Sequence, residues 1–286
     1  MKHIVSFSGG KDSTALILWA KENLESFTAV YCDTKWEHPL TYIYLEEINN
    51  KLLDGKLVYI SSKKYDGFED LSIKRKRVPS AKARFCTEEL KIIPMVDYLK
   101  TIDGEKIVYQ GIRADESIRR SQMADEGFDE TYNCMVKRPL FRWTALDCFA
   151  IMQKHGVEPN PLYKMGARRV GCMPCVMVNK KELLQIIIRN PEVIEKIKAL
   201  EDKLGSTFFP PQYIPDRFCS NFAMVTVPIF DEDGNKTEIT KQEKRYYPTV
   251  DEVVKYMTDK NNKDQIDMFV SDEDDQCMSY YGLCGI

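Results

Sequence analysis

The chain has 286 residues, a formal net charge of −3 and 43% hydrophobic residues, which is enough apolar material for one large domain or two smaller ones. No apolar run approaches the length of a membrane span, and the first residues pass directly into a structured pattern. We therefore expect a cytoplasmic protein with no membrane partner. The small net charge argues against general affinity for nucleic acid, although a local basic patch can still bind it. Nine cysteines in a reducing compartment favour metal binding or redox chemistry over a disulfide framework.

The first predicted element is a short buried strand over residues 4–7, followed by a helix from Ser13. Gly9 and Gly10 lie at the corner between them and let a ligand approach the main chain. Backbone N–H groups at the positive end of the helix dipole favour a phosphate, and Lys11 adds a mobile positive charge. The kinase-type phosphate loop and the dinucleotide fingerprint require glycines that this stretch lacks. The corner therefore predicts a phosphate site of another kind.

Further apolar runs predict strands over residues 27–32, 56–62 and 106–112, with a helix over 88–100 before the last of them. Strands separated by helices indicate a parallel sheet covered on both faces. In such sheets the ligand lies at the carboxyl ends of the strands, so we expect the polar clusters there to meet at one edge. The clusters are residues 8–13, 33–37 and 111–120.

The second half of the chain predicts helices and one hairpin rather than further sheet strands. The predicted elements are helices over 143–155, 180–190 and 191–203 and a hairpin over 224–240 with its turn at Asp233 and Gly234. We divide the chain into a nucleotide-binding α/β domain, residues 1–165, and a cysteine-bearing C-terminal region, residues 166–286, that packs on it.

The six residues SGGKDS, Ser8 to Ser13, resemble the pyrophosphate loop of the adenine nucleotide alpha hydrolase superfamily, whose members cleave ATP between its α and β phosphates. Four later blocks resemble the phosphoadenosine phosphosulfate reductase family within that superfamily, and they occur in family order. They are CDTKWEHPLTY (32–42), RFCTEELKIIP (84–94), GIRADESIRR (111–120) and PLYKMGARRVGCMPC (161–175). The resemblance implies a Rossmann-like, doubly wound parallel sheet with a helical or irregular cysteine-bearing region after it.

A bound adenine nucleotide, either ATP or a sulfonucleotide such as PAPS or APS, is implied at this loop. Cleavage at the α-phosphate builds charge on the leaving pyrophosphate, which Lys11, backbone amides and the hydroxyls of Ser8, Ser13 and Thr14 can stabilise. Asp12 can help to hold Mg²⁺. Lys11 and Asp12 are the expected catalytic residues of the loop. The expected nucleotide-binding residues are Ser8, Gly9, Gly10, Lys11, Asp12, Ser13, Asp33, Gly111 and Arg113.

The arginines after the fourth predicted strand can grip phosphate or sulfate through forked hydrogen bonds. We expect Arg113, Arg119 and Arg120 to take this part. Asp115 and Glu116 are expected to orient those arginines rather than to act as bases.

Cys172 and Cys175 form a C-x-x-C unit, a spacing that lets both thiolates reach one metal atom or cluster. Many members of the family that the chain resembles carry a [4Fe-4S] cluster, and the resemblance implies Cys86, Cys172 and Cys175 as ligands. We choose Cys284 as the fourth ligand, with Cys277 or Cys219 as substitutes. A Zn²⁺ ion on the same thiolates is the alternative. The cysteines expected to be small core residues are Cys32, Cys134 and Cys148.

Two further features stay open. The run KRKRVPSAKAR, residues 74–84, is either a solvated loop or a patch for a polyanion such as a nucleic-acid strand. Trp36 either stacks on a base or packs in the core.

Three functions fit these features. The first is an enzyme that cleaves ATP to AMP and pyrophosphate and couples this to iron-sulfur-dependent sulfur transfer or redox chemistry, which the complete loop favours. The second is a sulfonucleotide reductase in which Cys284 attacks sulfur and releases sulfite, which the tail Cys284-Gly285-Ile286 favours. The third is a non-enzymatic nucleotide and cluster sensor. A nucleic-acid acceptor, a thiol or sulfur donor protein and a homodimer are left open as partners.

Overall fold

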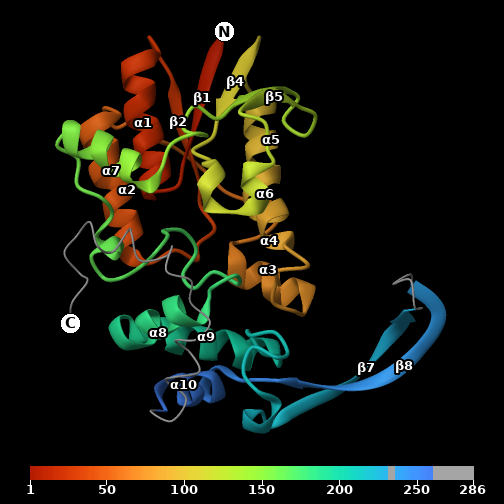
Figure 1. Ribbon diagram of the computed structural model, residues 1–286. Coiled ribbons are helices and arrows are strands. Elements are labelled where there is room, and N and C mark those ends of the chain that lie inside the picture. The colour runs from red at the N-terminus through yellow and green to blue at the C-terminus, as the bar shows by residue number, and fades with distance from the viewer. Residues whose placement is uncertain (231–235, 260–286) are drawn as a thin grey trace. The chain divides into compact units, whose positions relative to one another are not determined.

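The computed structural model describes residues 1–230 and 236–259. These residues form two compact units, one made of residues 1–71 and 83–175 and the other of residues 72–82 and the described residues from 176 onward (Figure 1). This division differs from the predicted boundary at residue 165, because the segment that carries Cys172 and Cys175 belongs to the first unit. Within the described ranges, no helix has the length and apolar character that crossing a membrane requires.

A six-stranded sheet in the order β3-β2-β1-β4-β6-β5 forms the centre of the first unit. Every neighbouring pair is parallel except β5 and β6, which are antiparallel. The strands are β1 (Lys2–Phe7), β2 (Thr28–Cys32), β3 (Val58–Ile60), β4 (Lys106–Tyr109), β5 (Glu126–Asp129) and β6 (Cys134–Lys137). The predicted doubly wound α/β sheet is confirmed. The sequence analysis missed β5 and β6, because both are short and β5, at the sheet edge, lacks a buried apolar run.

Helices cover both faces of this sheet, and the alternation of side chains along β1 explains how (Figure 1). Val5 and Phe7 enter a core with residues of α1 (Lys11–Asn23), α2 (Pro39–Leu52) and α7 (Ala145–Lys154). Ile4 enters a second core with residues of α5 (Ile93–Lys100). The predicted helix over 88–100 begins with a π-helical turn, Glu88–Ile92. The shorter helices of the region are α3 (Phe68–Arg75), α4 (Phe85–Thr87), α6 (Ile118–Ser121) and 3-10 turns at Ala114–Glu116 and Pro161–Tyr163.

The strand order reverses between β1 and β4. From β1 the chain moves outward to β2 and β3, and it then returns to the other side of β1 as β4. The register places Val5 opposite Tyr109, so the segments after β1 and after β4 leave the sheet as neighbours. In open α/β sheets this reversal creates the crevice in which ligands bind. The topology therefore directs attention to residues 8–13 and 111–113.

The second unit combines helices with a long two-stranded ribbon. Its elements are α8 (Lys180–Arg189), α9 (Pro191–Leu204), β7 (Asn221–Phe230), β8 (Lys236–Tyr247) and α10 (Val250–Thr258). The apolar side chains of Leu183, Ile197 and Val253, one from each helix, are buried. The predicted hairpin is confirmed, and its strands extend beyond the predicted range at the open end. Its predicted turn at Asp233 and Gly234 lies outside the described residues.

Candidate functional site

Residues 8–13 form a tight corner between β1 and α1. Gly10 is the extended N-cap of α1 and makes no side-chain capping bond. The Ser13 hydroxyl closes the corner, because it accepts a hydrogen bond from the Ser8 backbone N–H at 3.1 Å and donates to the Gly10 carbonyl at 3.0 Å. Gly9 has a φ of +74°, and a Cβ atom there would lie 3.3 Å from the methyl group of Thr41. A side chain at residue 9 is therefore disfavoured by both the backbone and the packing.

The 3-10 turn at Pro161–Tyr163 holds this corner in place. The Lys11 N–H donates to the Tyr163 hydroxyl at 2.9 Å, and the Asn160 side-chain amide donates to the Gly9 carbonyl at 3.2 Å. The Lys11 ammonium lies 5.6 Å from the centre of the Tyr163 ring. The sequence analysis assigned no role to Asn160 or Tyr163, because each lies about 150 residues from its partner. The only sequence signal was the block over residues 161–175, which contains Tyr163 but not Asn160.

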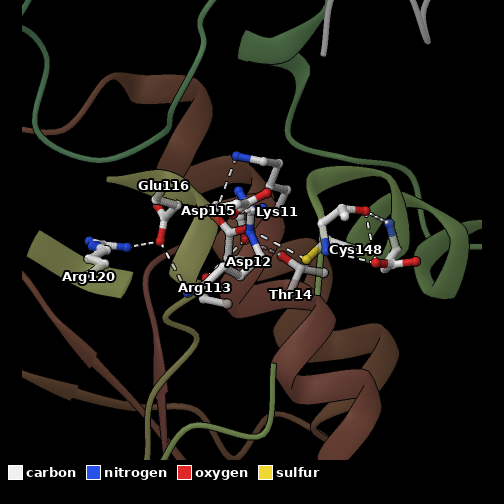
Figure 2. Close-up of polar contacts among 12 residues, drawn as sticks. Lys11, Asp12, Thr14, Arg113, Asp115, Glu116, Arg120 and Cys148 are labelled. Atoms are coloured by element: carbon white, nitrogen blue, oxygen red, sulfur yellow. Dashed lines mark hydrogen bonds and ion pairs between the residues drawn. The ribbon is translucent and has the colours of Figure 1, made fainter. Parts of the chain in front are cut away.

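Three charged side chains meet beside the corner (Figure 2). Arg113 donates from Nε to Asp12 Oδ1 at 2.5 Å, and Lys11 Nζ lies 3.4 Å from Asp12 Oδ2. Burial raises the pKa of Asp12, whereas the charges and hydrogen bonds of Lys11 and Arg113 lower it. The lowering is the larger effect, so the pKa of Asp12 lies below its usual value. The Cys148 thiol, fully buried on α7, is 3.5 Å from Asp12 Oδ1. The result is a partly buried carboxylate that stays ionised between two cations.

Some of the predicted loop roles need correction. Lys11 is not a mobile surface charge, because its side chain is buried beside Asp12. The Thr14 hydroxyl is fully buried and donates to the Gly10 carbonyl, so it is turned away from a phosphate above the loop. Both carboxylate oxygens of Asp12 face cations, and its predicted part in holding Mg²⁺ stays a prediction.

The segment after β4 contributes a chain of arginine and carboxylate pairs (Figure 2). Arg113 donates to Asp115, and Arg120 donates to Glu116, as expected for carboxylates that orient arginines. Burial lowers the pKa of Arg120, and the nearby positive charge of Arg169 lowers it further. The repulsion between these guanidinium groups favours an anion between them.

Gly111 brings the same segment against the loop. A Cβ atom on Gly111 would lie 2.9 Å from the Asp12 carbonyl oxygen and 3.2 Å from the Ser13 nitrogen. Both are backbone atoms, which cannot move aside cheaply. The structure therefore places Gly111 and Arg113 beside the predicted phosphate loop.

The segment after β2 contributes Asp33 and a buried carboxylate. Asp33 Oδ1 accepts hydrogen bonds from the Tyr42 hydroxyl and from the Lys35 N–H, both at 2.8 Å. The same Tyr42 hydroxyl lies 3.2 Å from Glu37 Oε2, so it bridges the two carboxylates. Trp36 is fully buried, packs on the Phe68 ring and donates to the Pro174 carbonyl. Trp36 therefore packs in the core rather than stacking on a base.

The C-x-x-C segment is docked against this second strand end. The backbones of Glu37 and Cys172 form a β-bridge, and the Cys172 sulfur lies 3.3 Å from the Thr34 hydroxyl and 3.7 Å from Glu37 Oε1. Burial raises the pKa of Cys172 to about 11, although the positive charge of Lys91 opposes the rise. At neutral pH this sulfur is therefore a thiol.

The predicted metal ligands are only partly brought together. Burial raises the pKa of Cys86, and the charge of Cys175 adds to the rise, while Cys175 also acts on Cys172. Yet within residues 1–230 and 236–259 no three histidine, cysteine or acidic side chains are placed to hold a metal ion. Cys219 belongs to the second unit. Cys284 and Cys277 lie outside the described residues. The cysteines among the described residues do not by themselves fit a cluster or Zn²⁺, so no step is assigned to a metal.

The three cysteines expected in the core differ in burial. Cys134 and Cys148 are buried, as predicted, whereas Cys32 is only half-buried, and its thiol faces the Lys91 carbonyl at 3.7 Å.

A doubly wound sheet with a glycine-rich corner at its reversal point defines an α/β protein of the nucleotide-binding type. The phosphoadenosine phosphosulfate reductase domain family matches residues 2–178, which is more than half of the chain. The chain therefore belongs to this family, and the predicted resemblance is confirmed.

Several proteins of known sequence are similar to this chain over different shares of their length. An uncharacterized 37.8 kDa protein of Escherichia phage 186 is 36% identical over 79% of this chain and 84% of its own length. An uncharacterized protein of Methanocaldococcus jannaschii is 29% identical over 67% of this chain but only 45% of its own length. The adenosine 5'-phosphosulfate reductase of Allochromatium vinosum is 28% identical over 41% of each chain. The present chain thus spans less than half of the last two proteins.

Among solved structures, the phosphoadenylyl-sulfate reductase of Candida auris in a phosphate complex has a TM-score of 0.49 and 16% identity, over 61% of this chain and 83% of that one. The FMN adenylyltransferase of Candida glabrata has a TM-score of 0.44 and 16% identity, over 60% of this chain and 53% of that one.

Proposed function

We propose that the chain binds ATP at residues 8–13 and cleaves it between the α and β phosphates, releasing pyrophosphate as an acceptor attacks the α-phosphate. The observation that carries this proposal is the complete corner at the sheet's reversal point, with Lys11 and Arg113 held beside it by Asp12. Charge accumulates on the leaving pyrophosphate in the transition state, and fixed cations at a helix N-terminus stabilise such charge. ATP has a β,γ pyrophosphate that uses these groups, whereas a sulfonucleotide has none.

In this proposal the residues of the chain bind and orient the nucleotide. The loop amides at the start of α1 and the Lys11 ammonium face the β and γ phosphates. Asp12 fixes the positions of Lys11 and Arg113 rather than moving a proton, because its lowered pKa keeps it ionised. Asp33, at the end of β2, is proposed to accept a hydrogen bond from a ribose hydroxyl. Coupling of this cleavage to sulfur transfer or redox chemistry at the cysteines is part of the proposal.

A second candidate is reduction of a sulfonucleotide with release of sulfite. It is favoured by the relatives that are named adenosine 5'-phosphosulfate reductase. The attacking thiol would be Cys284, which lies outside the described residues.

Product analysis separates the two candidates. The protein is purified without oxygen and incubated with ATP, and separately with phosphoadenosine phosphosulfate or adenosine phosphosulfate and a thiol donor. AMP with pyrophosphate supports the first candidate, and sulfite supports the second. Neither product in any incubation would contradict both.

Two variants and one control test which residues are needed for pyrophosphate release and for sulfite release. Lys11→Ala should reduce pyrophosphate release by about 100-fold, the usual loss when one preorganised charge-stabilising group is removed, while the thermal unfolding transition persists. Lys21→Ala, on the exposed part of the same helix, is the matched control and should keep full turnover. Unchanged turnover in Lys11→Ala would remove that residue from the phosphate site. Cys284→Ser should abolish sulfite release if the second candidate holds.

A further inference from the structure

The ribbon of β7 and β8 has no further strand beside it in the second unit, since the described topology pairs these strands only with each other. They run antiparallel from Asn221 opposite Tyr247 to Pro228 opposite Thr240. An isolated two-stranded ribbon is marginally stable in water unless one of its faces is covered. A ribbon of this length with exposed apolar side chains therefore indicates a binding surface.

One face of the ribbon carries an aromatic pair and a cation. Phe222 lies opposite Tyr246 with ring centres 6.0 Å apart, and Met224 lies opposite Lys244 in the next pair on the same face. The Lys244 ammonium is 3.9 Å from the Phe222 ring centre and 4.6 Å from that of Tyr246. Phe222 is 56% exposed and Met224 is 57% exposed. We call Phe222, Met224, Lys244 and Tyr246 the ribbon patch.

The charge of the ribbon indicates which kind of ligand it binds. Strand β7 contains no charged residue. Over residues 239–247 the charged side chains are Lys241, Lys244 and Arg245 against Glu243, and Glu243 is already paired with Arg245 at 3.0 Å. The described ribbon side chains are therefore net cationic, with Lys244 on the face of the aromatic rings and Lys241, Glu243 and Arg245 on the opposite face.

The basic run singled out in the sequence, except for Ala83 and Arg84, lies in the same unit. Residues 72–82 belong to the second unit, and Lys74, Arg75, Lys76 and Arg77 are all exposed there. Basic residues outnumber acidic ones among the described residues of this unit, although the whole chain is slightly acidic. The second unit thus concentrates positive charge that the first unit does not share.

We propose that the ribbon patch binds single-stranded nucleic acid, with bases stacked on Phe222 and Tyr246 and the phosphate backbone facing Lys244 and the other cations of the unit. Exposed rings beside lysines are the arrangement that proteins use for single strands, because every base has a face that stacks. A protein partner would use the apolar side chains but would not need the excess positive charge. This inference goes beyond ATP cleavage and does not depend on it.

The test is direct binding of a fluorescent oligonucleotide of mixed sequence, measured by anisotropy with the full chain. DNA and RNA single strands and a DNA duplex are compared. We expect the single strands to bind more tightly than the duplex, with a Kd that rises as salt is added. Phe222→Ala should weaken single-strand binding by about fivefold or more, and Phe222→Trp should restore it. Lys244→Ala should lower the slope of log Kd against log salt by about 0.7.

Two exposed residues of the first unit are matched controls. Phe128→Ala removes a ring that is 62% exposed on β5, and Lys56→Ala removes an exposed lysine. Both variants should bind as the wild type does, and circular dichroism should show that all variants are folded. Equal losses in Phe128→Ala and Phe222→Ala, or no salt-dependent binding by the wild type, would overturn the proposal. So would a concentration-dependent dimer that Phe222→Ala dissociates, because a second copy of the chain would then occupy the patch.

Because the readout is binding, its failure is distinct from that of the proposed catalysis. A chain that binds the oligonucleotide but releases no pyrophosphate supports this inference alone.

Discussion

The corner at residues 8–13 and the cysteine segment lie in the same unit but are built in different ways. At the corner, short-range contacts within residues 8–14 fix the backbone, and distant residues then lock it. At the cysteine segment, the sulfur of Cys172 depends on Thr34 and Glu37, which lie more than 130 residues away. The comparison teaches that a turn made by consecutive residues can be predicted from the sequence, whereas side-chain contacts between segments far apart in the chain cannot.

The largest expected effect comes from breaking the ion pair at the corner. Arg113→Ala should lower the free energy of unfolding by about 3–5 kcal/mol, because it removes the buried guanidinium and leaves the partly buried Asp12 without its closest cation. The additional change Asp12→Asn should restore part of this loss. Chemical denaturation measures both, with Arg142→Ala at an exposed arginine as the control. A loss below 1 kcal/mol, on the order of a surface ion pair, would contradict the pairing.

The same variant changes the acid dependence of stability. In the wild type the pKa of Asp12 is lowered in the folded state, so its contribution to stability is present above the pKa of the unfolded chain and is lost as pH falls through the lowered folded-state pKa. We expect Arg113→Ala to lose part of this acid dependence. Unfolding curves recorded from neutral pH downward provide the measurement.

A second test of the corner adds a side-chain atom where another segment packs closely against its backbone. Gly111→Ala inserts a Cβ atom 2.9 Å from the Asp12 carbonyl, and we expect a loss of about 1–3 kcal/mol in stability together with weaker nucleotide turnover. Gly127→Ala is the matched control, since an added Cβ there meets no atom of the described structure within 4 Å. Equal effects in the two variants would show that the fit at Gly111 is not tight.

A smaller loss in stability is expected when the hydrogen bond between Tyr163 and the corner is removed. Tyr163→Phe removes the hydroxyl that accepts the Lys11 N–H, and the loss in stability should be about 0.5–1.5 kcal/mol. Tyr98→Phe, at a half-buried tyrosine on the other face of the sheet, serves as the control. A Tyr163→Phe protein as stable as the wild type would mean that the corner holds its shape without this bond.

The cysteine segment has its own test. Because the pKa of Cys172 is raised to about 11, its alkylation by iodoacetamide at neutral pH should be slow, and the rate should increase about tenfold for each unit by which the pH rises toward that value. Mass spectrometry of the labelled peptide gives the rate. Rapid labelling at pH 7, as for a free surface thiol, would contradict the described environment.

The sequence predicted the first strand, the corner and α1 because their signals are local: an apolar run, two glycines and a helical pattern. It also predicted that residues 33–37 and 111–120 meet residues 8–13 at one edge of the sheet, since parallel strands end there, and Gly111 and Arg113 do lie beside the corner. It did not predict the pairing of Arg113 with Asp12, which spans 101 residues, or the part of Tyr163. Those contacts depend on side-chain directions that only the packed structure defines.

The residues that hold the corner and the first cysteine of the C-x-x-C unit lie on one short stretch of chain. Asn160 and Tyr163 bind the loop backbone, the Val170 carbonyl lies 3.5 Å from where a Gly10 Cβ would be, and Cys172 follows two residues later. One short stretch of backbone therefore contacts the corner and also sets the position of this sulfur.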